Sequence, residues 1–425
     1  MSSIAPDNSL QARVVTMAVQ EMPSGKGQFI RNTSFFWIGV CFFLVPSLIN
    51  TYLLMPFPGS QNIEAITFCY YFTPVIVPLR IIGGVFLAIY MFKYFSALTL
   101  KNKLIRVGII LVAICTIYLT DVQFKAAKMF EEPQDIVFAN AMRNKVPLSD
   151  LVIGVVHNGV AKAYPIIYLG YHHKIQDDVN GMPVMVTYCT MCRTGVVFNP
   201  VIDGKRETFR LVGARHYNAI IEDASSKTWW YQATGIAAVG PQKGKHLEEI
   251  SYTQATLSNW LKRYPASLIL QPDKHYKDEY LDLENYDRVQ AVERDSSILD
   301  KDALVRKSWI LGVKINGNAK AYDWRRLVSR HLINDNFHGT SLLVGIEADS
   351  LSYHVLQSNV DGKNLHFELF GDNELKDTET SSVWNWNGQC LSGPNKGKKL
   401  NEIQASQEYW HAWKYFNPST VYSRD

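Results

Sequence analysis

The distribution of apolar residues changes near residue 121. Residues 35–54 contain no charged side chain, and this run is long enough to cross a hydrocarbon core of roughly 30 Å. Two further apolar segments follow at about 74–92, which contains Arg80, and at about 104–120. We therefore predict three transmembrane helices within 34–121, with Arg80 extending its aliphatic stem toward the membrane interface. An interfacial hairpin is the alternative for the second and third segments.

The flanking charges predict how these helices are oriented. Residues 1–33 are polar and lack the apolar core and cleavage site of a removable signal peptide, so we interpret them as a cytoplasmic tail. Lys and Arg occur before the first span and between the second and third, but not between the first and second. By the positive-inside rule, the chain beyond residue 121 is extracytoplasmic and the lipid bilayer is a partner. If the third segment did not cross, that part of the chain would lie in the cytosol.

Beyond residue 121, short strand-like runs alternate with turn signals. Residues 122–147 mix Lys, Glu and apolar positions, which favours a partly helical stalk. Asn-Gly and Asp-Gly pairs then separate apolar runs, and such pairs tolerate the positive φ of tight hairpins. They occur at Asn158-Gly159, Asn180-Gly181, Asp203-Gly204 and Asp361-Gly362. We predict two tandem, mainly antiparallel β (α+β) domains after the α-helical membrane domain, each with one helix near its end, at about 256–264 and 406–415.

These two domains are predicted to be copies of each other. Residues 153–164 match 311–322 at an offset of 158, and the match continues without a gap through several landmarks. The landmarks are His173/His331, Asp177/Asp335, Gly181/Gly339, Phe209/Phe367 and Gly213/Gly371, followed at shorter offsets by Gly235/Gly388 and Trp260/Trp410. The resulting boundaries are a first repeat at 148–271, a connector at 272–307 and a second repeat at 308–425.

Residues confined to one copy are candidates for chemistry, whereas shared residues are expected to build the fold. At the 158 offset, Cys189 is replaced by Glu347, Cys192 by Ser350, His172 by Arg330 and His157 by Ile315, and residues 214–219 have no full counterpart. The shared His173 is expected to be structural, and Asp177 is expected to satisfy turn amides. We therefore predict one active and one degenerate copy.

The main candidate site is the loop that carries Cys189 and Cys192, two of six cysteines, between strand-like runs at 183–188 and 195–198. Two thiolates at this spacing can chelate a soft or borderline ion. Our primary hypothesis is a copper or zinc centre, with His172 and His216 completing the ligand set. Tyr188, Arg193, Tyr217, Trp230 and Gln232 are the expected surrounding residues, with Arg193 tuning the charge.

Two alternatives remain for the cysteine pair. It can act as a dithiol that cycles with a disulfide, or it can brace the loop of a non-catalytic binding or scaffold module. A redox or metal-donor partner is expected if the pair binds a metal or cycles as a dithiol. The net charge of +4 over 425 residues is too small to indicate nucleic-acid binding. No phosphate-binding loop, dinucleotide fingerprint or nucleophile elbow is present, so the sequence assigns no reaction and leaves open whether the protein is an enzyme.

Several motifs of the first copy resemble domain-of-unknown-function family 3179, an uncharacterised bacterial family. The resemblance rests on the 158–165 opening, the 172–177 segment, the Thr187-Tyr188-Cys189 to Cys192-x-Thr194 loop, Tyr217-Asn218 and the 230–235 segment. It covers about 151–273 well and the second copy weakly. Where many members have Pro and Gly in the thiol loop, this chain has Thr190 and Arg193. The resemblance implies no reaction.

Overall fold

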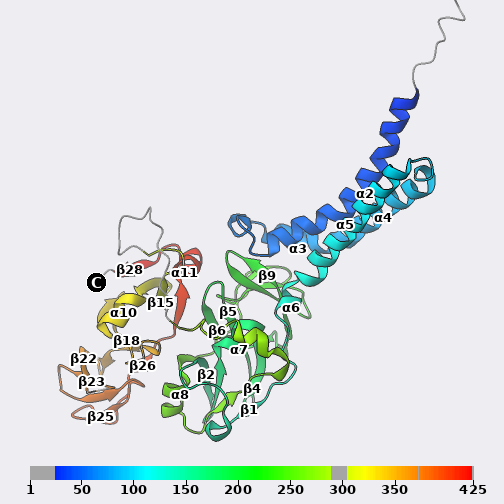
Figure 1. Cartoon of the computed structure of the whole chain (residues 1–425). Coiled ribbons are helices and arrows are strands. Elements are labelled where there is room, and N and C mark those ends of the chain that lie inside the picture. Colours follow the sequence, from blue (N-terminus) through cyan, green and yellow to red (C-terminus); the bar gives the residue numbers. More distant parts are fainter. Residues whose placement is uncertain (1–23, 289–303, 372, 424–425) are drawn as a thin grey trace, which may run out of the picture. The chain divides into compact units, whose positions relative to one another are not determined.

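The computed structural model describes residues 24–288, 304–371 and 373–423, which fall into two separate units (Figure 1). The helical unit takes its described residues from Met1–Thr51 and Tyr71–Gln123, and the β-rich unit takes them from Tyr52–Tyr70 and Phe124–Asp425. Residues 1–23 of the predicted tail and 289–303 of the predicted connector lie outside the described residues.

Three apolar stretches are long enough to cross a membrane, as the sequence predicts: Thr33–Leu54, Ile66–Tyr94 and Leu100–Gln123. They are formed by α2 (Ser24–Leu54), α3 (Ile66–Phe72), η2 (Thr73–Val75), α4 (Ile76–Tyr94), α5 (Leu100–Tyr118) and the π-helical turn η3 (Leu119–Gln123). Helix α2 begins well before the predicted residue 35, within the segment interpreted as a tail. Side chains such as Phe92 and Val112 are exposed, which suits a lipid environment.

Arg80 has a charged partner that was not predicted. Its guanidinium forms an ion pair with Asp121 and a hydrogen bond with the Ser47 hydroxyl. A charge within an apolar layer is costly unless it is paired, so Asp121 provides the compensation. Helices α2 and α4 approach closely at Gly83, where a Cβ would lie 2.7 Å from the Phe43 amide nitrogen.

The first half of the β-rich unit contains three main sheets. A five-stranded sheet has the order β1-β14-β3-β2-β13, a three-stranded sheet has the order β4-β5-β6, and a four-stranded sheet has the order β12-β11-β10-β9. Their strands are β1 (Phe138–Ala139), β2 (Leu151–His157), β3 (Val160–Pro165), β4 (Lys174–Val179), β5 (Met182–Cys189), β6 (Thr194–Phe198), β9 (Phe209–Arg215), β10 (Asn218–Asp223), β11 (Trp229–Tyr231), β12 (Ala237–Val239), β13 (Thr253–Thr256) and β14 (Leu268–Leu270). The small ribbon β7 (Val201–Ile202) and β8 (Lys205–Arg206) and the helices α7 (Ile166–His172) and α8 (Leu257–Arg263) complete this half.

The second half also has three main sheets, each four-stranded, with the orders β27-β15-β16-β28, β17-β18-β19-β26 and β22-β23-β24-β25. Their strands are β15 (Trp309–Ile315), β16 (Asn318–Asp323), β17 (Leu332–Phe337), β18 (Thr340–Ile346), β19 (Tyr353–Gln357), β22 (Phe367–Phe370), β23 (Glu374–Asp377), β24 (Val383–Asn385), β25 (Cys390–Ser392), β26 (Asn401–Glu402), β27 (Ala405–Tyr409) and β28 (Val421–Ser423). The ribbon β20 (Asn359–Val360) and β21 (Lys363–Asn364), and the helices α10 (Trp324–Arg330) and α11 (Trp410–Phe416), complete this half.

The predicted antiparallel β architecture is confirmed in outline. Among the described strands, β14 with β3 and β16 with β28 are parallel, whereas the other pairs are antiparallel. The Asn-Gly and Asp-Gly turns also form: Asn158 has φ 44° and Gly159 has φ 80° between β2 and β3. The hydrophobic pattern and turn chemistry therefore determine the local strand pairing.

The helix predictions are only partly correct. Helix α8 agrees with its predicted position, but 405–409 form β27 and α11 starts at Trp410. The helices α7 and α10 were not predicted. The predicted stalk contains α6 (Ala126–Met129), η4 (Ala141–Arg143) and β1, and β1 joins the five-stranded sheet.

Asp177 has a different structural role from the one predicted. One carboxylate oxygen accepts hydrogen bonds from Lys162 Nζ and Tyr164 OH, each at 2.7 Å. The turn amide of Gly181 is instead satisfied by Asp178, because the alternation of β4 directs neighbouring side chains to opposite faces. Asp177 thus joins two strands through side chains and does not cap the turn.

Candidate thiol site

The predicted thiol loop is the turn of a buried hairpin. Strands β5 and β6 pair antiparallel, and their last matched residues are Cys189 and Thr194. Both strands are apolar and buried, so the turn between them lies in the core. Cys189 and Cys192 are each 0% exposed, and no disulfide joins them.

Arg193 closes this turn in an unusual backbone conformation. Its φ is 58°, the left-handed region that glycine adopts most easily. The buried guanidinium lies 3.5 Å from the centre of the Trp309 ring and donates to Tyr286 O at 3.0 Å and Gln407 Oε1 at 3.1 Å. These contacts connect the loop to the second half, so Arg193 anchors the loop.

Several amide groups surround the Cys189 sulfur. Burial by itself raises the pKa of the Cys189 thiol, but the Cys192 thiol and the backbone amides of Cys192, Ala219 and Met191 outweigh it, and the pKa lies below its ordinary value. The Tyr217 carbonyl oxygen lies 4.0 Å from the sulfur. These hydrogen bonds therefore stabilise the Cys189 thiolate relative to that of a free cysteine.

Cys192 has the opposite tendency. Burial, together with the nearby Cys189 sulfur and its charge, holds the pKa of the Cys192 thiol well above its ordinary value. Asn218 Nδ2 lies 3.3 Å from the Cys192 sulfur and Gln232 Oε1 lies 3.9 Å from it. The surroundings thus lower the pKa of the Cys189 thiol and raise the pKa of the Cys192 thiol.

A buried polar network holds these two amides in position. Asn218 Nδ2 donates to Gln232 Oε1 at 3.2 Å, and Gln232 Nε2 donates to Thr187 Oγ1 at 2.8 Å and to the Thr194 carbonyl oxygen at 3.0 Å. These four polar side chains are all 0% exposed. A fully paired network in a low-dielectric interior fixes the amide orientations that the sulfurs experience.

The two predicted histidine ligands are engaged elsewhere. His172, at the end of α7, has Nε2 2.6 Å from Tyr280 OH and Nδ1 within hydrogen-bonding distance of Glu131 O. His216 has Nε2 2.8 Å from Glu64 and stacks on Tyr415 with ring centres 4.0 Å apart. The structure therefore brings the two cysteines together but does not join these imidazoles to them.

The segment 214–219 contacts residues 52–70 of the same unit. Arg215 is fully buried and donates to Leu53 O at 2.7 Å and to Ser60 O at 3.0 Å. Together with the His216–Glu64 contact, these hydrogen bonds hold the segment 214–219 against residues 52–70. Its predicted confinement to one copy does not by itself identify ligands.

The other predicted surrounding residues differ in their proximity to sulfur. Gln232 and the backbone of Tyr217 reach the cysteines, as described above, whereas Trp230 donates its Nε1 proton to Asp223 at 3.0 Å. Tyr188 is buried next to Cys189 in the chain and packs edge-on against Tyr286. Asn218, Thr187 and Thr194 were not predicted as site residues, although all three lie within motifs that carried the family resemblance.

A different group could hold a metal ion. Among the residues that the structure describes, ligand atoms of three His, Cys, Asp or Glu side chains lie within 4.8 Å of one another at Asp135, Asp273 and His275. Asp273 already accepts hydrogen bonds from the backbone amides of Gln134, Asp135 and His275. Spacing could not have revealed this group, because Asp135 lies far from the other two in sequence.

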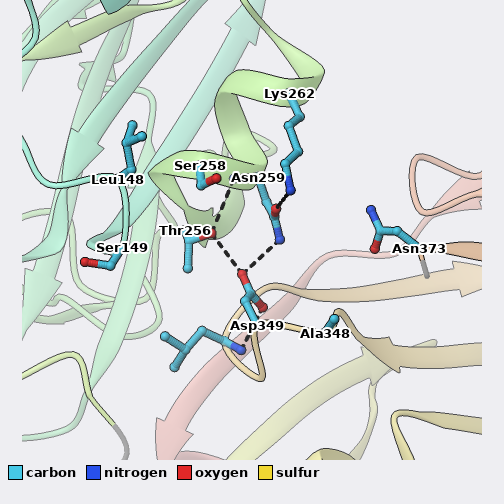
Figure 2. A pocket seen from close by; sticks show the side chains of 10 residues that line it. Leu148, Ser149, Thr256, Ser258, Asn259, Lys262, Ala348, Asp349 and Asn373 are labelled. Atoms are coloured by element: carbon cyan, nitrogen blue, oxygen red, sulfur yellow. Dashed lines mark hydrogen bonds between the residues drawn. The ribbon is translucent and has the colours of Figure 1, made fainter.

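A cavity of about 590 Å³ lies elsewhere in the β-rich unit (Figure 2). Asp349 accepts hydrogen bonds from Thr256 and Asn259 there, and Lys262 donates to Asn259 at 2.9 Å. These polar groups are paired with one another, and neither cysteine lines the cavity. The cavity is therefore separate from the thiol chemistry.

Comparison with known proteins gives a family but no activity. No curated protein and no solved structure matches the chain. A family model described as "Protein of unknown function (DUF3179)" matches residues 134–420, which include both β-rich halves and the thiol loop. The chain belongs to this family of unknown function.

Proposed function

We propose that the protein is a membrane-anchored redox protein in which Cys189 and Cys192 cycle between two thiols and a disulfide. The observation that carries the proposal is their placement in one turn with different surroundings. Hydrogen bonds from backbone amides lower the pKa of the Cys189 thiol, whereas the side-chain amides of Asn218 and Gln232 flank Cys192. Thiol–disulfide exchange needs such a pair, with one sulfur ready to attack and the other retaining its proton.

The exchange balances with a partner disulfide. The Cys189 thiolate attacks one partner sulfur, which forms a mixed disulfide and releases one partner thiol. Cys192 then loses its proton and attacks Cys189, which closes the internal disulfide and releases the second partner thiol. Two electrons pass to the partner, and the reverse sequence restores the dithiol. Because both sulfurs are buried, the turn must open locally for the partner to reach them.

The predicted copper or zinc centre has less support from the described contacts. A zinc site normally has four ligands. Because the imidazoles of His172 and His216 bind other residues, the two sulfurs would supply only two of these four. Two thiolates alone suit only a soft ion such as Cu(I). The redox interpretation needs no further ligand, so the geometry favours it.

The test uses the full chain purified in detergent. After equilibration with reduced or oxidised glutathione, the protein is denatured, alkylated and weighed by mass spectrometry. We expect two thiols to be lost and regained together in the wild type, but not in Cys189→Ser or Cys192→Ser. Cys390→Ser is the matched control, because Cys390 is buried without a neighbouring cysteine among the described residues. A redox-insensitive pair, or bound copper or zinc that disappears with the pair, would overturn the proposal.

We also propose that 148–271 and 308–425 are copies of one domain, joined by the connector 272–307. Matching contacts support this duplication: a Cβ at Gly154 would lie 2.2 Å from the Trp260 ring, and one at Gly312 would lie 2.3 Å from Trp413. If the two halves are copies, Trp413 corresponds to Trp260, in place of the predicted Trp410. Likewise, Lys320 and Tyr322 bond Asp335 as Lys162 and Tyr164 bond Asp177.

The proposed side of the membrane is extracytoplasmic. Three helices of sufficient length and the distribution of Lys and Arg support a cytoplasmic N-terminus and an external C-terminus. An oxidising compartment would also favour disulfide cycling. Protease digestion of sealed membrane vesicles of known orientation tests this placement. Cleavage of the β-rich unit from the cytoplasmic side alone would contradict it.

A further inference from the structure

Another cavity of the β-rich unit contains charged groups that do not neutralise one another. Its volume is about 290 Å³, and its walls come from both halves, including Val196 of β6 and Gly312 of β15. Three ionisable side chains line this cavity: Glu249, Lys314 and Glu408. Two of them are carboxylates and one is an ammonium group, so the cavity has an excess of negative charge when all three are ionised.

Glu408 is the buried member of this set. It lies on β27 and is 5% exposed. Its carboxylate accepts a hydrogen bond from the Ser406 hydroxyl at 2.7 Å, but within the part of the chain that the structure describes it forms no ion pair. A buried carboxylate is costly unless a cation compensates its charge. The cavity is the side from which such a cation can reach Glu408.

The other two charged groups do not supply this compensation. Glu249 and Lys314 are both exposed, and neither forms an ion pair among the described residues. The Lys314 ammonium group instead lies 5.5 Å from the centre of the Trp413 ring, within the range of a cation–π contact. Lys314 is therefore not paired with Glu408 in this structure.

The remaining walls are largely apolar. Val196, Ala405 and the buried rings of Tyr252 and Trp413 line the same cavity. Sites for small molecules combine such walls with a few polar groups that fix the orientation of the ligand. A metal ion is less suitable, because no group of three close ligand atoms among the described residues includes a carboxylate of this cavity. The lining fits a ligand with one cationic head and a short apolar tail.

We propose that this cavity binds a small organic cation, such as a primary alkylammonium ion, whose ammonium group pairs with Glu408. The exposed carboxylate of Glu249 adds to the negative potential, and the apolar walls enclose the tail. This binding function goes beyond the proposed redox function and does not depend on it. Because the walls come from both halves, a bound cation would contact both and stabilise their packing.

The test measures binding of propylammonium to the full chain in detergent, by equilibrium dialysis with the radiolabelled amine at pH 8. Propionate, an anion of similar length, is the matched control ligand. We expect one saturable site for propylammonium and none for propionate. Glu408→Gln keeps an acceptor for the Ser406 hydroxyl but removes the charge, so the dissociation constant should rise on the order of 10-fold. Glu368→Gln should bind as the wild type does, because Glu368 is exposed and does not line the cavity.

The pH dependence of binding gives a second measurement. Burial raises the pKa of Glu408 to about 7. The other groups that interact with its charge are Ser406, Lys314, Thr194, Glu249, Tyr252, Tyr353 and Cys192. Below pH 7 the carboxyl group is protonated and no longer pairs with a cation, so binding should weaken on the order of 10-fold between pH 8 and pH 6. This change should disappear in Glu408→Gln.

Lys314→Met provides a variant with the opposite effect. It removes the like charge from the cavity, so propylammonium should bind more tightly than to the wild type. If Glu408→Gln does not fold, this variant decides the question, and an unchanged affinity overturns the proposal. The proposal also fails if the wild type shows no saturable binding of propylammonium, if propionate binds equally well, or if Glu408→Gln keeps the affinity of the wild type.

Discussion

Arg193 offers the most direct test of how the thiol loop is held. Replacing it with Ala removes a buried guanidinium that contacts the Trp309 ring and donates to Tyr286 O, Asp287 O and Gln407. A desolvated cation–π contact contributes about 2 kcal/mol. Acceptors left unpaired cost about 1–3 kcal/mol more. We therefore expect Arg193→Ala to lower the free energy of unfolding by about 3–5 kcal/mol.

The backbone makes a second, independent contribution. Because residue 193 has φ 58°, any side chain there carries the strain of the left-handed region, which costs roughly 1–2 kcal/mol relative to glycine. Arg193→Gly loses the same contacts as Arg193→Ala but relieves this strain. The glycine variant should therefore be about 1 kcal/mol more stable than the alanine variant, contrary to the usual effect of glycine.

Thermal and denaturant unfolding of the purified full chain measure both differences. Arg210→Ala is the control, because Arg210 is mostly exposed and its ion pair with Glu222 should contribute less than about 1 kcal/mol. The reasoning fails if Arg193→Ala matches the wild type, or if Arg193→Gly is the less stable of the two variants. The first result would mean that the guanidinium contacts do not stabilise the loop, and the second that the turn is not strained.

Three further predictions test the packing and the charge of the two halves. Gly154→Ala and Gly312→Ala should each destabilise the protein by about 1–3 kcal/mol in denaturant unfolding, because the added methyl group meets a tryptophan ring; a neutral effect at either position would contradict the packing. Asp177→Asn and Asp335→Asn should cost similar amounts, about 1–3 kcal/mol each, since each loses a lysine and a tyrosine partner; unequal effects would argue against matching roles. Burial lowers the pKa of His173 from 6.5 to about 4, so at low pH the unfolded chain binds a proton that the folded chain does not. The contribution of His173 to the free energy of unfolding is therefore complete above pH 6.5 and falls by about 2 kcal/mol at pH 5. His173→Asn should remove this loss, and an unchanged pH dependence of unfolding in the variant would refute the prediction.

Local chemistry explains what the sequence could predict. Asn158 and Gly159 favour a tight hairpin through their own backbone preferences, and an uncharged apolar run is long enough to span a membrane regardless of its neighbours. The C-x-x-C spacing likewise places two sulfurs in one turn. Each of these features depends on residues close in the chain, so each is visible in the sequence.

The features of the site that were not predicted depend on residues far apart in the sequence. His172 resembled a ligand, but its imidazole is engaged by Tyr280 and by Glu131 O, both distant in sequence. The contact between the Tyr409 amide and Cys192 O gave no signal either, because it forms only when β27 packs beside the thiol loop. Side-chain ligation and loop anchoring are set by tertiary packing, which the spacing of residues does not encode.

The same contacts give the second half a part in holding the thiol loop. It provides Trp309 and Gln407 to Arg193 and the Tyr409 amide to the Cys192 carbonyl oxygen. That half contains no Cys-x-x-Cys pair of its own. The position of the cysteine pair therefore depends on both halves, although only one of them carries it.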